Sequence, residues 1–174
     1  MKNTFIESEI WLLSRLGAFL RANIYKPEAS DLQKRQFSFK LKGSLDNLIV
    51  SQYSKAVSED QHIENIERLS DFSGAFDCTL KEGLNFGVSQ KLLNLYLKYN
   101  WCLDKIPTPP HFPVDSIIQK ELRLPVIPWT KMKGDKGKSD YMNIIEAAKL
   151  QLRGNDCKNV AELELKLFRR NLFV

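Results

Sequence analysis

The sequence predicts an all-α fold, because two features favour helices along most of the chain and none favours a sheet. Apolar residues recur at intervals of three and four in several segments, which is the periodicity of one helix face. Residues typical of helix starts precede several of these segments. No segment shows the alternation of apolar and polar residues that several paired strands would require. We therefore expect residues 1–174 to form one domain, a bundle of about six to seven helices with a central element in which a hairpin leads into a helix.

The first helix is expected over residues 6–25, and Pro27 should end it. Its core-facing side is predicted from the spacing of five apolar residues, which are Ile6, Ile10, Leu13, Leu16 and Leu20.

The second and third helices both begin with a capping box, in which the side chains of the first and fourth residues bond reciprocally to backbone amides. Ser30 and Gln33 form the first box, and this helix should continue to about Val57. Ser58 and Gln61 form the second box. Both serines are therefore predicted to be N-caps.

Four further helices are expected in the second half of the chain. Residues 73–87 contain three glycines and predict turns, whereas residues 88–103 are the most apolar segment and predict a central helix. A proline-rich loop at 104–113 should precede a short helix at 114–123 and a second loop at 124–138. Ser139 should open a helix that stops before Gly154, and Asn159 should cap a last helix that runs to about Asn171.

Composition excludes several classes of protein. Hydrophobic residues make up 43% of the chain, which is too much for a disordered protein. No apolar run approaches the roughly 18 residues that a membrane span needs, and Glu7 and Glu9 stand where an export signal would be basic and apolar. We therefore expect no membrane partner and a cytoplasmic location.

The three cysteines give no support to a metal site. Cys78, Cys102 and Cys157 are odd in number and lack metal-ligand spacing, so no metal and no cofactor is expected. Cys102 falls within an apolar helical pattern and is expected to be a small buried hydrophobic residue.

The net charge of +5 is modest, but the basic residues are clustered. One cluster contains Lys34, Arg35, Lys40 and Lys42, a second contains Lys131, Lys133, Lys136 and Lys138, and Arg169 and Arg170 lie near the end of the sequence. Such clusters can follow a phosphate backbone, although solvated surface is the simpler interpretation of any one of them.

Two short segments could together carry chemistry. In the first, Asn85 to Lys91, Gly87 is predicted to form a turn with positive φ, and the amides of the following residues could bind phosphate at a helix start. Lys91 would lie one turn into an apolar helix, where desolvation lowers the pKa of an amine toward that of a usable nucleophile. In the second segment, Phe112 to Lys120, Asp115 could cap a helix or face the lysine across a cleft.

This arrangement resembles the helix-hairpin-helix DNA glycosylases. The family's hairpin pattern ends in Gly-Val-Gly-x-Lys, and it is matched here by Gly87, Val88, Ser89, Gln90 and Lys91. A later Val-Asp of the family is matched by Val114 and Asp115, and Lys120 stands where the family has a basic residue. Ser89 replaces the second glycine of the pattern, and Ile117 replaces a histidine. The resemblance implies that Lys91 attacks the sugar carbon to form a Schiff base and that Asp115 assists departure of the base. It also implies a flipped base and DNA as the partner.

A pocket for such a base is the remaining candidate feature. Asn94, His111, Phe112 and Trp129 are candidates to line it, because aromatic rings stack on bases and the polar groups could orient the base or Lys91. Core packing is the simpler role for all four residues. Gly87, Val88, Ser89 and Gln90, together with the lysine cluster at 131–138, are the candidates for binding nucleic acid.

Three hypotheses for function follow. The first is a base-excision DNA glycosylase with lyase activity, in which Lys91 and Asp115 are catalytic. The second is a helical protein that binds nucleic acid without chemistry, in defence against mobile elements or in their upkeep. The third is a protein-interaction domain whose first helix and apolar segment Leu172 to Val174 form an oligomer seam. The sequence does not determine the oligomeric state.

Overall fold

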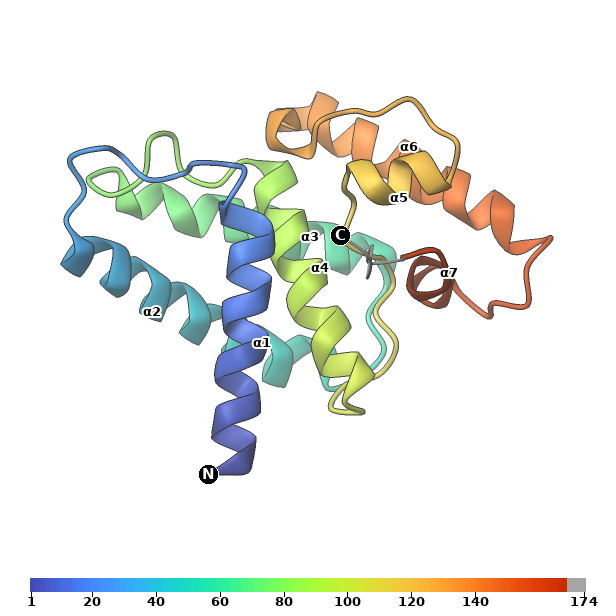
Figure 1. The fold of residues 1–174 in the computed structure, drawn as a ribbon, viewed down its shortest axis with the longest axis horizontal. Coiled ribbons are helices and arrows are strands. Elements are labelled where there is room, and N and C mark those ends of the chain that lie inside the picture. Colours follow the sequence, from blue (N-terminus) through green and yellow to red (C-terminus); the bar gives the residue numbers. More distant parts are fainter. Residues whose placement is uncertain (169–174) are drawn as a thin grey trace, which may run out of the picture.

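The computed structural model describes residues 1–168 and has the expected all-α architecture (Figure 1). Within these residues the only β-type pairing is an isolated bridge between Tyr25 and Leu80. Short π-helical and 3₁₀ segments occur at Ile49–Tyr53, Gly74–Phe76 and Trp129–Lys131. The seven α-helices are α1 (Lys2–Phe19), α2 (Asp31–Leu48), α3 (Glu59–Ser73), α4 (Phe86–Cys102), α5 (Ser116–Glu121), α6 (Gly134–Leu152) and α7 (Val160–Leu167).

Helix α4 is the centre of the bundle, as its composition predicted. It contacts α1, α3, α6 and the short 3₁₀ turn at Trp129–Lys131, and buried residues occupy most of its circumference. Figure 1 shows α1 running beside α4, with α2 on one side of this pair and α5, α6 and α7 on the other. The other elements are therefore positioned relative to α4.

Helix α1 presents a different face to the core from the one its leucines predicted. Ile10 is buried, but Leu13, Leu16 and Leu20 are 39%, 44% and 79% exposed. The buried face instead contains Ser14 and Ala18. Gly17 also lies against α4, because a Cβ added there would be 2.6 Å from Leu95 Cδ1. Small residues allow the two helices to approach closely, so the larger leucines are left outside the contact.

Helix α1 also ends earlier than Pro27, at Phe19. The chain leaves it through Asn23, which adopts a positive φ of 47°. The residues from Leu20 to Pro27 therefore form the connection to α2 rather than a last helical turn.

The helix starts were predicted well, because capping is a local interaction. Ser30 and Gln33 form the full capping box of α2. Ser58 caps α3 and Asn159 caps α7, each by accepting a hydrogen bond from the amide three residues later. The predicted box at Ser58 is only half formed, because the Gln61 side chain bonds to Glu64 and Asn65 instead of reaching back. Asp115 caps α5 by accepting from the amides of Ile117 and Ile118.

Three other predictions were wrong. Helix α6 begins at Gly134 instead of Ser139, because the chain turns at Gly134 with a φ of +54° and Gly137 then fits against the backbone of Met132. Cys102 is exposed, because it lies in the last turn of α4, beyond the contacts that bury the centre of that helix. Helix α2 ends at Leu48 and continues as the π-helical segment to Tyr53.

The last helix ends at Leu167, short of Asn171. The predictions made for Arg169, Arg170 and the segment Leu172 to Val174 lie outside the described residues. Within the described part of the chain, no helix has both the length and the hydrophobicity needed to cross a membrane.

The glycine that forms the turn before α4 is Gly83, not Gly87. Gly83 has a φ of +72°, whereas Gly87 lies in the first turn of α4, which Asn85 caps. Gly87 is required for a different reason: a Cβ there would lie 1.8 Å from the carbonyl oxygen of Trp129. The absence of a side chain therefore allows the turn at Trp129–Lys131 to pack directly on the start of α4.

Replacing Gly87 by alanine should destabilise the protein by about 3 kcal/mol, because the added methyl group meets backbone that cannot rotate away. The control is Gly43→Ala in α2, where nothing lies within 4 Å of the added Cβ. There, alanine should stabilise the protein by about 0.5–1 kcal/mol through the lower entropy of its unfolded chain. Urea unfolding measures both effects, and equal stabilities of the two variants would contradict this account of Gly87.

Candidate active site

A groove between α1, α4, α5 and α7 contains both residues that the sequence proposed as catalytic. Lys91 and Asp115 line it together with Lys98 and Glu164, and its volume is about 520 Å³. Arg21 also lines it. Its apolar wall is formed by exposed leucines of α1 and by side chains from the other elements, which include Leu13, Leu16, Leu20, Leu95, Ile117, Trp129 and Phe168. The leucines that α1 does not bury in the core thus form one side of this groove.

Lys91 and Asp115 form a buried ion pair at this groove. Lys91 Nζ lies 2.5 Å from Asp115 Oδ2, and the two side chains are 8% and 15% exposed. The other carboxylate oxygen, Oδ1, accepts hydrogen bonds from the amides of Ile117 and Ile118 at 2.9 and 3.0 Å. The two roles that the sequence allowed for Asp115 are therefore performed at once by its two oxygens.

Gln90, the residue before Lys91, holds the segment that carries Asp115. Its side-chain amide donates to the carbonyl oxygen of Val114 at 2.9 Å, and its side-chain oxygen accepts from the Val114 amide at 3.1 Å. Two consecutive residues of α4 thus contact two consecutive residues of the extended chain before α5. This double contact fixes where Asp115 lies relative to Lys91.

A second buried ion pair lies beside the first. Lys98 Nζ is 2.7 Å from Glu164 Oε2 and 2.8 Å from Oε1, and the Glu164 side chain is only 4% exposed. Lys91, Leu95 and Lys98 share one face of α4, since they are spaced by four and three residues. This spacing could have indicated from the sequence that Lys98 lies near Lys91, whereas nothing in the sequence indicated that Glu164 of α7 would pair with Lys98.

Burial and the ion pairs shift the pKa values of Lys91, Asp115 and Glu164. Burial lowers the pKa of the Lys91 amine, and the negative charge of Asp115 only partly opposes this effect. Burial alone would raise the pKa of Asp115, but the charge and hydrogen bond of Lys91 outweigh it, so this pKa lies below its ordinary value. Burial raises the pKa of Glu164 despite the nearby Lys98 and Lys91. Buried titratable groups at an accessible groove are typical of functional sites.

The predicted phosphate-binding amides at the start of α4 are already used within the protein. The amide of Gly87 donates to Met132 O, that of Val88 to Asn85 Oδ1, and that of Ser89 to Asn85 O. Gln90 is buried and bonded to Val114, as described above. The prediction that Gly87, Val88, Ser89 and Gln90 bind nucleic acid is therefore wrong, because these donors are satisfied and covered.

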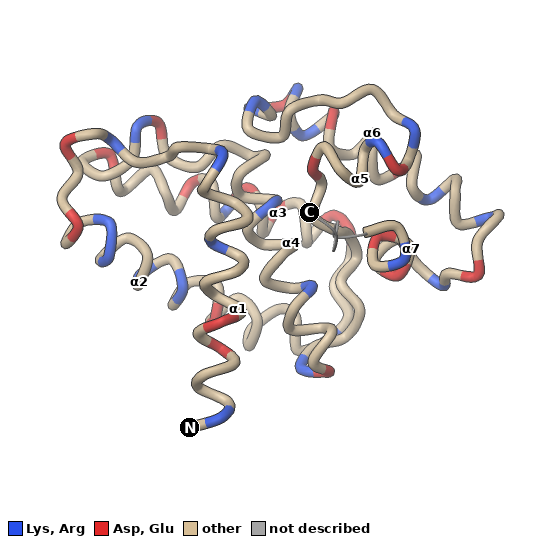
Figure 2. Tube along the Cα trace, viewed as in Figure 1, with Lys and Arg blue, Asp and Glu red and all other residues tan. Residues whose placement is uncertain are grey.

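The lysine cluster at 131–138 is largely neutralised by acidic neighbours. Lys133 pairs with Glu82, Lys136 with Asp140 at 2.9 Å, and Lys138 with Glu67 at 2.7 Å. Among residues 1–168, Lys131 has no ion-pair partner. Basic and acidic positions alternate along the start of α6 in Figure 2. The cluster is thus a mixed-charge surface, since the fold brings Glu67 and Glu82 to it from distant parts of the chain.

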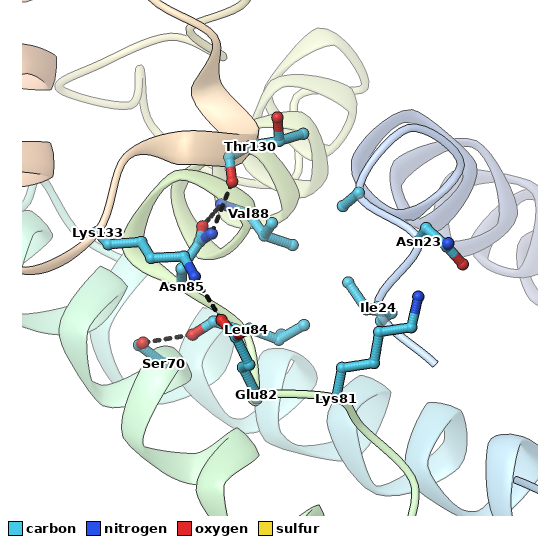
Figure 3. Close-up of a pocket in the computed structure, with 12 residues that line it drawn as sticks. Asn23, Ile24, Ser70, Lys81, Glu82, Leu84, Asn85, Val88, Thr130 and Lys133 are labelled. Atoms are coloured by element: carbon cyan, nitrogen blue, oxygen red, sulfur yellow. Dashed lines mark hydrogen bonds and ion pairs between the residues drawn. The ribbon is translucent and has the colours of Figure 1, made fainter. Parts of the chain in front are cut away.

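Lys133 and Glu82 border a separate pocket of about 410 Å³ between the end of α1, α3 and the loop before α4. Figure 3 shows Asn85 among the lining residues, bonded to Val88 and to the carbonyl oxygen of Thr130, while Ser70 bonds to Leu84. The polar groups drawn here mainly tie the loop to the bundle.

The four residues proposed for a base pocket do not line one cavity. Trp129 reaches the groove of Lys91 and Asp115. Trp129 is itself only 4% exposed, and Asn94, His111 and Phe112 are buried in the core away from this groove, with at most 2% of each residue exposed. The Asn94 side-chain amide donates to Gln90 Oε1 and to Tyr141 Oη, not to the Lys91–Asp115 pair. The proposed pocket is therefore wrong except for Trp129.

The burial of these residues creates a polar network in the core. Tyr141 Oη lies 3.0 Å from both Asn94 Nδ2 and His111 Nδ1. The His111 ring contacts the His62 ring with centroids 4.9 Å apart, and His62 Nδ1 lies 2.6 Å from Tyr53 Oη. Burial lowers the pKa of both histidines. The neighbouring His111 lowers the pKa of His62 further, and the charge of Lys149 helps to lower the pKa of His111 to about 3. Both rings are therefore neutral at pH 7.

No known protein family, characterised protein or solved structure shows detectable similarity to this chain. The resemblance to the helix-hairpin-helix DNA glycosylases consequently stays a prediction.

Removing one partner of the Lys91–Asp115 pair should be costly. Lys91→Met leaves a buried carboxylate without its cation and should reduce the free energy of unfolding by about 3–5 kcal/mol. Adding Asp115→Asn to Lys91→Met should recover much of the loss, because asparagine retains an oxygen for the cap of α5 without a charge. Urea unfolding of the single and double variants measures this coupling. A double variant less stable than Lys91→Met would contradict the pairing.

Acid should destabilise the fold through the two buried histidines. In the unfolded chain they take up protons as the pH falls below about 6.5, whereas in the folded state burial keeps them neutral, so protonation favours unfolding. Between about pH 6.5 and 5, the free energy of unfolding should fall by up to about 1.4 kcal/mol per pH unit for each histidine. Urea unfolding across this pH range tests the prediction. The free energy of unfolding should fall less steeply with decreasing pH in His111→Phe, and a free energy that does not change with pH would contradict the prediction.

Proposed function

We propose that the protein acts on DNA as a base-excision glycosylase with lyase activity, in which Lys91 is the nucleophile and Asp115 its partner. The observation that carries this proposal is the Lys91–Asp115 ion pair at the wall of an open groove. The residues lie 24 positions apart in the sequence and come from different elements. Their meeting at 2.5 Å in a groove is the arrangement that a nucleophilic amine and an assisting carboxylate require.

The chemistry uses the lowered pKa of the Lys91 amine. The ammonium first loses its proton to solvent, which leaves a neutral amine beside the Asp115 carboxylate. At an abasic site, the amine nitrogen adds to the C1′ aldehyde carbon of the open sugar. A C=N bond then replaces the C=O bond and water leaves, giving a Schiff base. At an intact nucleotide, the C1′–N bond to the base breaks as the Lys91 nitrogen bonds to C1′, and the base leaves with a proton.

The walls of the groove suit a sugar with an attached base. Trp129, Ile117 and the α1 leucines provide apolar surface, which excludes water and strengthens electrostatic interactions at the reacting carbon. The carboxylate of Asp115 is fixed by the cap of α5, so it can stabilise positive charge on the sugar without first reorienting. Arg21, which also lines the groove, adds a cation suited to the DNA backbone.

Borohydride trapping tests this mechanism. The protein is mixed with a labelled duplex that contains one abasic site, sodium borohydride is added, and the products are separated on a denaturing gel. We expect a covalent protein–DNA band, because the reductant converts the Schiff base to a stable amine. Lys91→Gln should lose the band, and Asp115→Asn should form it more slowly, by about 10²-fold or more for a lost acid–base partner.

Lys98→Gln is the matched control, because Lys98 is also a buried, ion-paired lysine of the same groove and the same face of α4. It should retain the band, provided that circular dichroism shows both glutamine variants folded at the assay temperature. Trapping by folded Lys91→Gln, or no trapping by the unchanged protein on duplexes with abasic or oxidised sites, would overturn the proposed chemistry.

A further inference from the structure

We propose that a pocket between α1 and α2 binds a phosphate-bearing nucleotide unit, with cations on its walls for the phosphate and an exposed aromatic ring for the base. The pocket has a volume of about 520 Å³ and lies on the side of α1 that contains Trp11 and Arg15. The groove of Lys91 is lined by Leu13, Leu16 and Leu20, on a different face of the same helix. This second site therefore does not depend on the chemistry of Lys91.

Basic residues dominate the charge of this pocket. Arg15, Lys34, Arg35 and Lys42 line it, against a single acidic lining residue, Asp31. Lys34 lies 3.5 Å from Asp31, and Lys42 pairs with Asp46 at 2.6 Å. In the described part of the chain, neither arginine has a carboxylate within ion-pair distance. Unlike the cluster at 131–138, this one retains an excess of positive charge, and Figure 2 shows basic positions along α2.

Two polar side chains at this pocket interact with each other. Burial raises the pKa of Tyr25 overall, although the charge of Arg15 and a hydrogen bond from its side chain act to lower this pKa. Both residues line the pocket. A guanidinium has five N–H donors in a planar fork, so Arg15 can donate to an acceptor in the pocket as well as to Tyr25. A phosphate oxygen accepts from both guanidinium and hydroxyl groups.

The aromatic residues of the pocket suggest what accompanies the phosphate. Phe39 lines the pocket from the third turn of α2, and it is 80% exposed. Trp11 is half-buried and packs edge-on against Tyr96. A planar base can stack on an exposed ring such as Phe39, whichever base it is. Phosphate donors and a stacking surface in one cavity match a nucleotide.

A membrane surface fits this geometry less well. Binding to anionic lipid needs an apolar face that enters the bilayer beside the basic residues. Here the basic residues surround a cavity between two helices, and the aromatic ring lies among them. Such a cavity encloses a small planar group with its phosphate, which either a free nucleotide or one unit of a nucleic-acid strand can provide.

Fluorescence polarisation tests the site with a short, fluorescein-labelled single-stranded oligodeoxynucleotide that lacks abasic sites, at low salt. Phe39→Ala should raise its Kd about five-fold or more, as expected for one lost stacking contact. Arg35→Gln should raise the Kd and reduce the slope of log K against log salt by about one, as expected for one lost phosphate contact. Both side chains are exposed, so neither substitution should disturb the fold.

The matched control is Lys40→Gln, which removes one charge from the same helix at a position outside the pocket, where Lys40 lies over the ring of Phe76. It should leave the Kd within about two-fold. Competition by deoxyadenosine monophosphate but not by inorganic phosphate would support the site and assign it to free nucleotides, whereas competition by unlabelled strand alone would assign it to nucleic acid.

Equal effects of Arg35→Gln and Lys40→Gln would overturn the proposal, because they would indicate diffuse attraction without a site. Binding to anionic phosphatidylserine vesicles with no binding to oligonucleotide or nucleotide would also overturn it. Because the oligonucleotide has no aldehyde and Lys91 lies in the other groove, these outcomes are separate from the trapping result.

Discussion

The arrangement of the site depends on the interactions of the Asp115 carboxylate. One of its oxygens accepts the hydrogen bonds that cap α5, and the other forms the ion pair with Lys91 in the most buried helix of the bundle. Gln90 reinforces this by holding Val114 with two hydrogen bonds. A charge this deeply placed is tolerated only when its partner and its hydrogen bonds are all present, so the position of α5 and the ionisation of Lys91 are set together.

The shape of the groove follows from how α1 meets α4. Contact through Ser14, Gly17 and Ala18 brings the two helix backbones close and turns Leu13, Leu16 and Leu20 outward. These leucines then provide an apolar wall next to two buried ion pairs. An amine beside such a wall is less hydrated than one on an open surface, which is the condition that lowers its pKa.

Acidic residues that are distant in the sequence determine how much positive charge each basic cluster retains. The lysines at 133, 136 and 138 looked like a nucleic-acid-binding cluster, yet each meets a carboxylate, two of them from other elements of the fold. The basic residues around Arg35 meet fewer acids and surround a cavity. Clusters of equal density in the sequence therefore differ in the folded protein, because ion pairing depends on which elements pack together.

The sequence alone determined the fold class, the central position of α4, and the caps at Ser30, Ser58, Asp115 and Asn159, because these depend on local hydrogen bonds and on helical periodicity. It also singled out Lys91 and Asp115, although not the distance between them. Only the tertiary structure decided which face of α1 is buried, that Gly87 is a contact point instead of a turn, and that Asn94 and His111 belong to a core network. These outcomes depend on close approach between segments far apart in the chain, and spacing within one segment carries no information about what packs against it.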